Sequence, residues 1–195
     1  MAKNNRQGKA KIWSDRDIKI MRSHLPRGWQ RLFFELHLYT GERVNAILQL
    51  KVSDLYDSAG NVLDTITFGG STRKASKHGR AKTRQIFVND ELRVFLENYN
   101  QPESGYLFPS SHSKTGYLTR KAVDKRWRSI FDVTGLSGYS THSGRHWLIN
   151  KLDDMGAGIS TIADAMCIDP ATVRSYLRYK GDRANKAIAS VRVAV

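Results

Sequence analysis

The sequence has one cysteine, four prolines and no long apolar run. The single Cys167 excludes a disulfide within the chain and suits a reducing compartment. No stretch reaches the roughly 18 consecutive apolar residues of a membrane span. Residues 1–6 are polar and basic and lead into no apolar segment, so a secretory signal is not expected. These absences predict a cytoplasmic protein that does not contact a membrane.

Acidic residues are also scarce. The chain has 18 Asp and Glu against 32 Lys and Arg, a net charge of +14 at pH 7. A field of this sign attracts polyanions, above all nucleic acid. Residues 1–11 contain no acid, and neither does the run from Ser71 to Arg84, which has six cations. Such cations repel one another unless a polyanion neutralises them, so we expect this run to bind DNA. A solvated charged loop is the alternative.

Periodicity predicts a mainly helical domain with a small β region. Ser14 suits the N-cap of a first helix that ends near Pro26. Two short strands are expected at 63–68 and 85–88, with the basic run as the tip between them. Further helices are expected just after Gly41 and at about 29–39, 90–99, 119–132, 142–155, 159–166, 170–179 and 183–192. We therefore predict an α+β, mainly α fold at 14–195 with a small antiparallel sheet, after a flexible basic arm at 1–13.

Three short segments carry residues suited to chemistry on a phosphate. In order they are Thr40-Gly41-Glu42-Arg43, His142-Ser143-Gly144-Arg145 and the segment Pro170-Ala171-Thr172-Val173-Arg174-Ser175-Tyr176. A guanidinium that grips phosphate with two hydrogen bonds, beside an imidazole that moves a proton, suits phosphoryl transfer. The pair His142 and Arg145 alone is a weak signal, so the weight lies in the order of all three segments.

In this order and at these separations the segments resemble the tyrosine recombinase (phage integrase) family, over nearly the whole chain from Ser14 onward. The resemblance implies the family's catalytic fold and site-specific cleavage and rejoining of DNA through a 3′-phosphotyrosine. It implies that two arginines bind the phosphate, that a histidine moves a proton and that a tyrosine attacks: Arg43, Arg145, His142 and Tyr176. It also implies a general-acid lysine on the β-hairpin, for which we slightly prefer Lys74 to Lys77.

The chemistry is consistent with these roles. A phenol with a pKa of about 10 attacks at neutral pH only if its proton is removed or the phosphate is activated. Two arginines stabilise the charge of a five-coordinate transition state. Because the covalent link conserves the phosphodiester bond, we expect no cofactor, no ATP and no metal. No carboxylate cluster with metal-ligand spacing is present in the sequence, which favours this route over a two-metal nuclease.

The sequence departs from the family at two points. Met166-Cys167 stands where the family usually has Gly-His, or a tryptophan in place of that histidine. A thiol is a weak hydrogen-bond donor, so we expect Cys167 to weaken one contact of the active site. Ala46 replaces the usual acidic residue after the first arginine and removes a support. Tyr179 lies one turn beyond Tyr176 and is the alternative nucleophile.

The expected partner is double-stranded DNA, which implies a nucleoid-associated location. We predict DNA contacts by five cations: Arg73, Lys77, Arg80, Lys82 and Arg174. The apolar segment 185–195 suits docking on a neighbour in a tetramer on DNA, with packing in cis as the alternative. Accessory DNA-bending proteins are further expected partners. The first segment begins at residue 40, which leaves no room for the family's N-terminal DNA-clamping domain, so the chain is either a compact enzyme or an excised catalytic domain.

Three other interpretations stay open. Residues 159–177 also resemble a helix-turn-helix, in which Tyr176 is a surface aromatic of a non-catalytic DNA-binding protein. That interpretation leaves the first two segments unexplained. The others are a catalytically silent recombinase and an enzyme like the type IB topoisomerases, which relaxes DNA as a monomer with the same chemistry. Three other histidines are expected to be structural or exposed: His24, His37 and His112. His146 directly follows Arg145 and points away from the face of His142, so it is expected to be structural.

Overall fold

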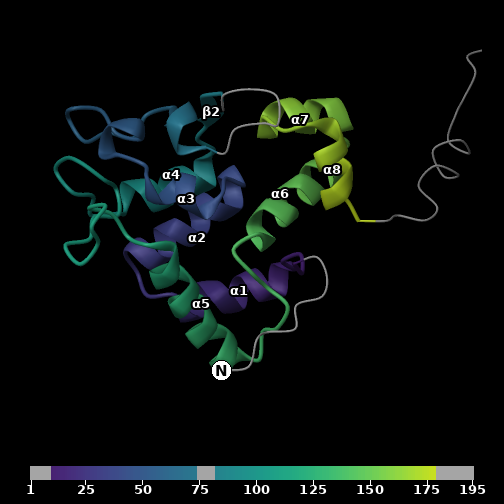
Figure 1. Cartoon of the computed structure of the whole chain (residues 1–195), viewed down its shortest axis with the longest axis horizontal. Helices are drawn as coiled ribbons and strands as arrows, with labels where there is room; N and C mark the ends of the chain where they lie inside the picture. Colours follow the sequence, from purple (N-terminus) through teal and green to yellow (C-terminus); the bar gives the residue numbers. More distant parts are fainter. Residues whose placement is uncertain (1–9, 74–81, 179–195) are drawn as a thin grey trace, which may run out of the picture.

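The computed structural model describes residues 10–73 and 82–178, which form a group of helices with one short hairpin (Figure 1). The helices are α1 (Asp15–His24), α2 (Trp29–Thr40), α3 (Val44–Leu48), α4 (Asp90–Glu97), α5 (Arg120–Thr134), α6 (Ser143–Asp154), α7 (Ile159–Met166) and α8 (Pro170–Tyr176). The strands are β1 (Thr65–Phe68) and β2 (Arg84–Phe87). The predicted mainly α fold and its small sheet are confirmed. The helix expected at 183–192 lies outside the described residues.

The two strands pair in antiparallel fashion, with Thr65 opposite Phe87 and Phe68 opposite Arg84. Ile66 and Phe68 are fully buried, and their strand neighbours are half-buried. The strand therefore has the inward and outward alternation of a sheet that covers a core on one face. The expected hairpin tip falls on residues 74–81, outside the described part of the chain.

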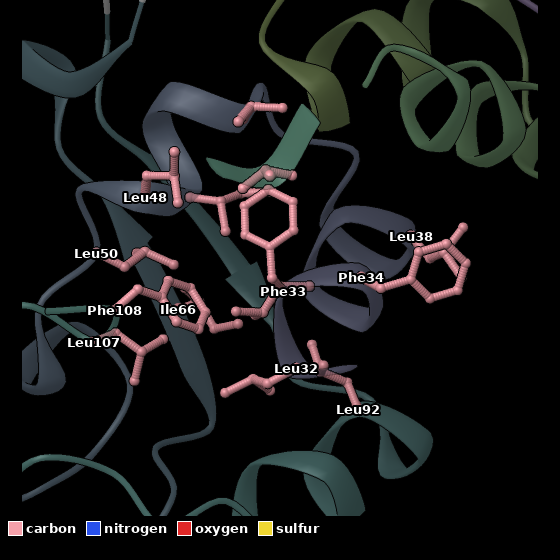
Figure 2. Close-up of a cluster of buried hydrophobic side chains, with 14 of the residues drawn as sticks. Leu32, Phe33, Phe34, Leu38, Leu48, Leu50, Ile66, Leu92, Leu107 and Phe108 are labelled. Carbon is pink, nitrogen blue, oxygen red and sulfur yellow. The ribbon is translucent and has the colours of Figure 1, made fainter. Parts of the chain in front are cut away.

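Helix α2 lies at the centre of the core. Every residue from 32 to 38 is buried, including the polar Glu35 and His37. Figure 2 shows the side chains of Leu32, Phe33, Phe34 and Leu38 on this helix, among Leu48, Leu50, Ile66, Leu92, Leu107 and Phe108. A helix that is buried on all sides is a core helix, so the residues that flank α2 are fixed by the packing of the whole domain.

The start of the described chain packs onto the domain. Trp13 is 3% exposed and stacks on the ring of Tyr139, with the ring centroids 4.0 Å apart. The Lys11 backbone N–H donates to Gly138 O at 2.9 Å. Ser14 caps α1 as predicted, because its hydroxyl accepts from the Asp17 N–H. Residues 11 and 13 of the expected arm are therefore held against the domain, whereas residues 1–9 lie outside the described part of the chain.

The glycines of the first two segments are needed for close packing. Gly41 ends α2 in the left-handed conformation at φ 59°, and a Cβ there would lie 2.8 Å from Met166 Cε. On α6, a Cβ at Gly144 would lie 2.5 Å from His37 Cδ2 and 2.9 Å from the His37 carbonyl oxygen. All three distances are too short for a real Cβ atom, so these glycines let α6 and α7 approach the end of α2.

Helices α6, α7 and α8 form a second, smaller group, seen in green to yellow in Figure 1. Its buried residues are Ile149, Ile162, Ala163, Met166 and Val173. Helix α6 also packs against α2, so it connects this group to the main core. Among the described residues, no helix combines the length and the apolar character that a membrane crossing requires.

We expect Gly144→Ala to destabilise the protein. Alanine usually stabilises a helix relative to glycine, but the added methyl group would overlap the His37 imidazole and backbone. Overpacking of this kind costs about 1–3 kcal/mol, which corresponds to a fall in Tm of roughly 2–12 °C for a chain of this size. Thermal unfolding followed by circular dichroism measures it.

Gly69→Ala is the matched control, because a Cβ at Gly69 would make only an ordinary contact, 3.8 Å from Ser71 Oγ. The Tm of Gly69→Ala should stay within a degree or two of wild type, because a glycine substitution without strain changes stability only slightly. Equal Tm values for Gly144→Ala and Gly69→Ala would contradict the tight approach of α6 to α2.

Candidate active site

The structure brings the first two predicted segments together around a pocket of about 390 Å³. The pocket is lined by Arg43 at the N-terminus of α3, by His142 and Thr141 before α6, and by Arg120 at the start of α5. Arg120 Nη2 donates to Thr141 Oγ1 at 3.4 Å. Three cationic or ionisable side chains from distant parts of the chain therefore face one pocket, which suits an anionic ligand.

Arg145, three residues after His142, is 1% exposed. Its Nη1 donates to Gly41 O at 2.8 Å, whereas Nε and Nη2 are buried and have no acceptor among the described residues. Burial lowers the pKa of Arg145 to about 10, against the opposing effect of Glu42, so the guanidinium is still charged at neutral pH. A buried cation with unused donors is costly unless an anion completes its hydrogen bonds.

Glu42, in the first segment, is the buried carboxylate of the site at 1% exposure. Its Oε1 accepts from Arg84 Nη1 at 2.9 Å and from Arg73 Nε at 3.0 Å. Burial would raise the pKa of Glu42, but the charges and hydrogen bonds of Arg84 and Arg73 hold it below its usual range. Glu42 is therefore ionised, and it neutralises part of a strongly cationic cluster.

Arg84 extends this network to other elements. It donates through Nη1 to Thr40 O at 2.8 Å and through Nε to Ala165 O at 2.7 Å. Since Thr40 ends α2 and Ala165 lies in the last turn of α7, one side chain on β2 ties two helix ends together. Capping of unpaired helix carbonyls by an arginine is favourable for both the hydrogen bonds and the helix dipole.

Arg73 is placed differently from the sequence expectation. We expected a DNA contact, but its side chain is 5% exposed and its nitrogens donate to Glu42, to Lys82 O at 2.7 Å and to Met166 O at 3.3 Å. These internal acceptors draw the guanidinium inward. Lys82 and Arg174 are exposed, as a DNA contact requires. Three other predicted residues, Lys74, Lys77 and Arg80, lie outside the described part of the chain.

Two histidines lie close to the network. Burial, together with the charges of Arg120 and Arg43, lowers the pKa of His142, so its imidazole is neutral at pH 7. His37 is fully buried, and its Nδ1–H donates to Glu42 O at 3.1 Å. Burial lowers the pKa of His37 to about 4. His142 can therefore accept a proton, while His37 supports the backbone of the first segment.

Tyr176 is half-buried against α6 rather than a free surface aromatic. Its ring meets that of His146 edge-on, with centroids 4.5 Å apart, and the Arg145 Cζ lies 5.9 Å from the ring centroid. This placement does not fit the surface aromatic of the helix-turn-helix interpretation. His146, expected to be structural, is buried and contacts the candidate nucleophile. Tyr179 lies outside the described residues.

Cys167 is exposed and follows α7 directly. At φ 47° it is the one non-glycine residue of positive φ in the described ranges. Its N–H donates to Asp164 O, which closes the end of α7. The two carbonyls just before it, from Ala165 and Met166, accept from Arg84 and Arg73. The position expected to supply an active-site contact therefore lies beside the arginine network.

Sequence reasoning missed Glu42, Arg84, Arg120 and the role of His146. One signal was available, because Arg84, Ile86 and Val88 alternate and place Arg84 on the inner face of β2. The pairing of Arg84 with a residue 42 positions away has no local signature. Arg120 lies outside every recognised segment, so only the fold shows that it faces the pocket.

We expect Glu42→Gln to lower the free energy of unfolding at pH 7 by about 3 kcal/mol, because Arg84 and Arg73 stay buried without their counter-charge. The folded-state pKa of Glu42 lies below its ordinary value. The stabilisation by the ionised Glu42 carboxylate is therefore complete above the pKa of an ordinary glutamate, about 4.3. It is lost as the pH falls through the folded-state pKa of Glu42. In urea unfolding, the difference from wild type should shrink below roughly pH 4.

The matched control is Glu103→Gln, which neutralises an exposed carboxylate. Glu103→Gln should change the free energy of unfolding by less than about 0.5 kcal/mol, both at pH 7 and below roughly pH 4. A Glu42→Gln variant that loses no more stability than Glu103→Gln would show that the buried network does not stabilise the domain.

Comparison with known proteins agrees with this geometry. Residues 18–180 match the sequence model of the phage integrase family. Three similar solved structures are the XerH site-specific recombinase bound to palindromic difH substrate in a post-cleavage complex, the integrase from mycobacterium phage Brujita and the Tn1549 transposon integrase in complex with circular intermediate DNA. No curated protein sequence matches the chain.

The three structures cover almost the whole of this chain at low sequence identity. XerH is 20% identical, with 97% of this chain and 55% of that chain covered and a TM-score of 0.65. The Brujita integrase is 18% identical, with 98% and 63% covered and a TM-score of 0.63. The Tn1549 integrase is 13% identical, with 96% and 68% covered and a TM-score of 0.71.

This chain thus spans little more than half of XerH and less than two thirds of the Brujita integrase. At these identities the structures establish the fold, while the sequence match establishes the relationship. The match runs from α1 to just beyond α8 and includes all three predicted segments. The chain therefore belongs to the phage integrase family, the tyrosine recombinases.

Proposed function

We propose that this chain acts as a site-specific DNA recombinase that cleaves and rejoins DNA through a 3′-phosphotyrosine on Tyr176. The observation that carries the proposal is Arg145, which is fully buried beside Tyr176 with two nitrogens lacking an acceptor among the described residues. A phosphodiester oxygen is a fitting acceptor, because a guanidinium binds two phosphate oxygens at once. The family and the net charge of +14 support DNA as the source of that phosphate.

In the proposed reaction, a DNA phosphate enters the pocket between Arg43 and His142 and meets Arg145. The Tyr176 phenol oxygen attacks phosphorus, and the bond to the 5′ oxygen of the next nucleotide breaks. His142, neutral at pH 7, takes the phenol proton, while a general acid protonates the leaving 5′ oxygen. The arginines stabilise the charge on the non-bridging oxygens. Attack by a 5′ hydroxyl on the phosphotyrosine reverses each step and rejoins the DNA.

The general acid is proposed from the family resemblance, and both candidates lie outside the described residues. Lys74 is the first candidate and Lys77 the second, because the family resemblance implies a general-acid lysine in the segment between β1 and β2. We propose DNA contacts by Lys77, Arg80, Lys82 and Arg174, which add salt-dependent affinity. A tetramer joined through residues 185–195, accessory DNA-bending proteins and a nucleoid-associated location complete the proposal.

The first test is covalent trapping on a nicked suicide substrate, from which the cleaved end diffuses away. We expect the wild-type protein to form a covalent adduct with DNA and Tyr176→Phe to form none, because phenylalanine has no attacking oxygen. Denaturing gel electrophoresis separates the adduct from free protein. The substrate must contain a site that the protein cuts, which a pool of random duplexes can provide.

Tyr179→Phe is the matched control and should retain the adduct. An adduct formed by Tyr176→Phe but absent from Tyr179→Phe would move the nucleophile to Tyr179. DNA binding without any adduct from the wild-type protein would support the silent recombinase or the non-catalytic DNA-binding protein.

A second test separates the phosphate clamp from general DNA affinity. Arg145→Lys keeps the charge but loses the planar pair of donors, so we expect cleavage at saturating DNA to slow by roughly 10²–10³-fold with little change in Kd. Arg174→Ala removes an exposed cation on α8. It should weaken binding and reduce the salt dependence of Kd, with roughly one fewer phosphate contact.

Single-turnover rates and binding isotherms give both quantities. If Arg145→Lys changed Kd in proportion to the rate, Arg145 would be a general DNA contact and the proposed clamp would be wrong.

A further inference from the structure

Asn150, on α6, holds the chain on both sides of the end of α8. It is 1% exposed. Its Nδ2 donates to Tyr176 O at 3.0 Å and to His146 O at 2.8 Å, and its Oδ1 accepts from the Arg178 backbone N–H at 2.9 Å. One buried amide therefore bonds the peptide groups on either side of Leu177, directly after the proposed nucleophile.

These bonds occur where a helix has least support of its own. Tyr176 is the last residue of α8, and Leu177 follows in an extended conformation at φ −65° and ψ 144°. The last carbonyls of a helix have no intrahelical donor. Here the Tyr176 carbonyl is bonded to a side chain of α6, so the position of Tyr176 is tied to that helix.

The same helix carries the proposed phosphate clamp. Arg145 precedes Asn150 by five residues, which is about 7.5 Å along a helix axis. Between them, His146 packs edge-on against the Tyr176 ring. Helix α6 thus carries the proposed phosphate-binding Arg145, contacts the Tyr176 ring through His146 and bonds the Tyr176 backbone through Asn150.

We propose that Asn150 is a positioning residue that fixes Tyr176 at the distance from Arg145 needed for attack. The inference rests on the proposed function. The positions of the nucleophile and of the bound phosphate are then both fixed by helix α6, rather than by two elements that move independently. A displacement of about 1 Å can slow such a reaction by roughly 10²-fold. The ion pair between Arg178 and Asp154 is exposed, so it adds little to this restraint.

Asn150→Ala tests the restraint directly. We expect single-turnover adduct formation at saturating DNA to slow by roughly 10–100-fold, while Kd for DNA stays within about threefold, because the Asn150 amide is bonded within the chain to His146, Tyr176 and Arg178. Leu152→Ala is the matched control, since it weakens packing in the same small cluster and keeps the bonds of Asn150. Its loss of Tm should be similar, with a much smaller change in rate.

A second pair of variants removes one bond without touching the core. Arg178→Pro has no backbone N–H, so the Asn150 Oδ1 loses its partner while proline remains compatible with the extended Leu177 before it. Arg178→Ala keeps the N–H and loses only the guanidinium. We expect Arg178→Pro to slow adduct formation by roughly tenfold relative to Arg178→Ala. Both variants change an exposed residue, so both should fold.

Hydrogen exchange gives a readout that needs no catalysis. The Arg178 amide is bonded to Asn150, so peptides that contain residues 177–178 should exchange faster in Asn150→Ala, whereas α7 should keep its protection. Leu152→Ala should not expose residues 177–178 selectively.

The outcomes separate the two proposals. If the wild-type protein forms an adduct but Asn150→Ala reacts as fast as Leu152→Ala, or Arg178→Pro as fast as Arg178→Ala, Asn150 does not position the nucleophile. A loss of rate matched by an equal loss of DNA affinity overturns the inference as well. If the wild-type protein forms no adduct, the proposed function itself fails.

Discussion

The arrangement of the site depends on one buried carboxylate among arginines. Glu42 accepts from Arg84 and Arg73, and its charge also acts on Arg145. Three guanidiniums in a poorly solvated region repel one another strongly, and one carboxylate offsets only part of that repulsion. The cluster is therefore stable enough to fold but remains positive. A bound phosphate would supply the missing negative charge at Arg145, so the same imbalance that limits stability favours the ligand.

Helix α6 fixes the positions of the proposed catalytic groups relative to one another. It carries Arg145, whose guanidinium lies over the Tyr176 ring, and contacts Tyr176 through His146 and Asn150. It can lie so close to α2 only because residue 144 is glycine, with no Cβ to meet His37. Motif residues that look catalytic in sequence thus divide into two kinds. Arg145 is placed to bind the ligand, whereas Gly144 has no Cβ and so allows α6 to pack closely against α2.

The sequence predicted the local structure well and the network only in part. Helix and strand positions follow from periodicity, and the order of three segments was enough to predict that Arg43, His142 and Arg145 converge. The partners of Arg84 could not be predicted, because Thr40, Glu42 and Ala165 meet it only after distant elements pack. The inward turn of Arg73 has the same cause. A count of charges predicts a cationic surface, but which cations are used internally depends on buried acceptors.

The two departures from the family act on different parts of this network. The acid absent at Ala46 was expected to leave the first arginine unsupported, yet Glu42 Oε2 accepts from the Arg43 backbone N–H at 3.2 Å. At Cys167 the side chain is a poor donor, but the left-handed backbone there ends α7 and leaves the carbonyls of Ala165 and Met166 bonded to Arg84 and Arg73. The substitution therefore changes a side-chain contact and leaves the backbone acceptors of the arginine network in place. Because those acceptors hold the arginines that neutralise Glu42, the frame around Arg145 does not require a histidine at position 167.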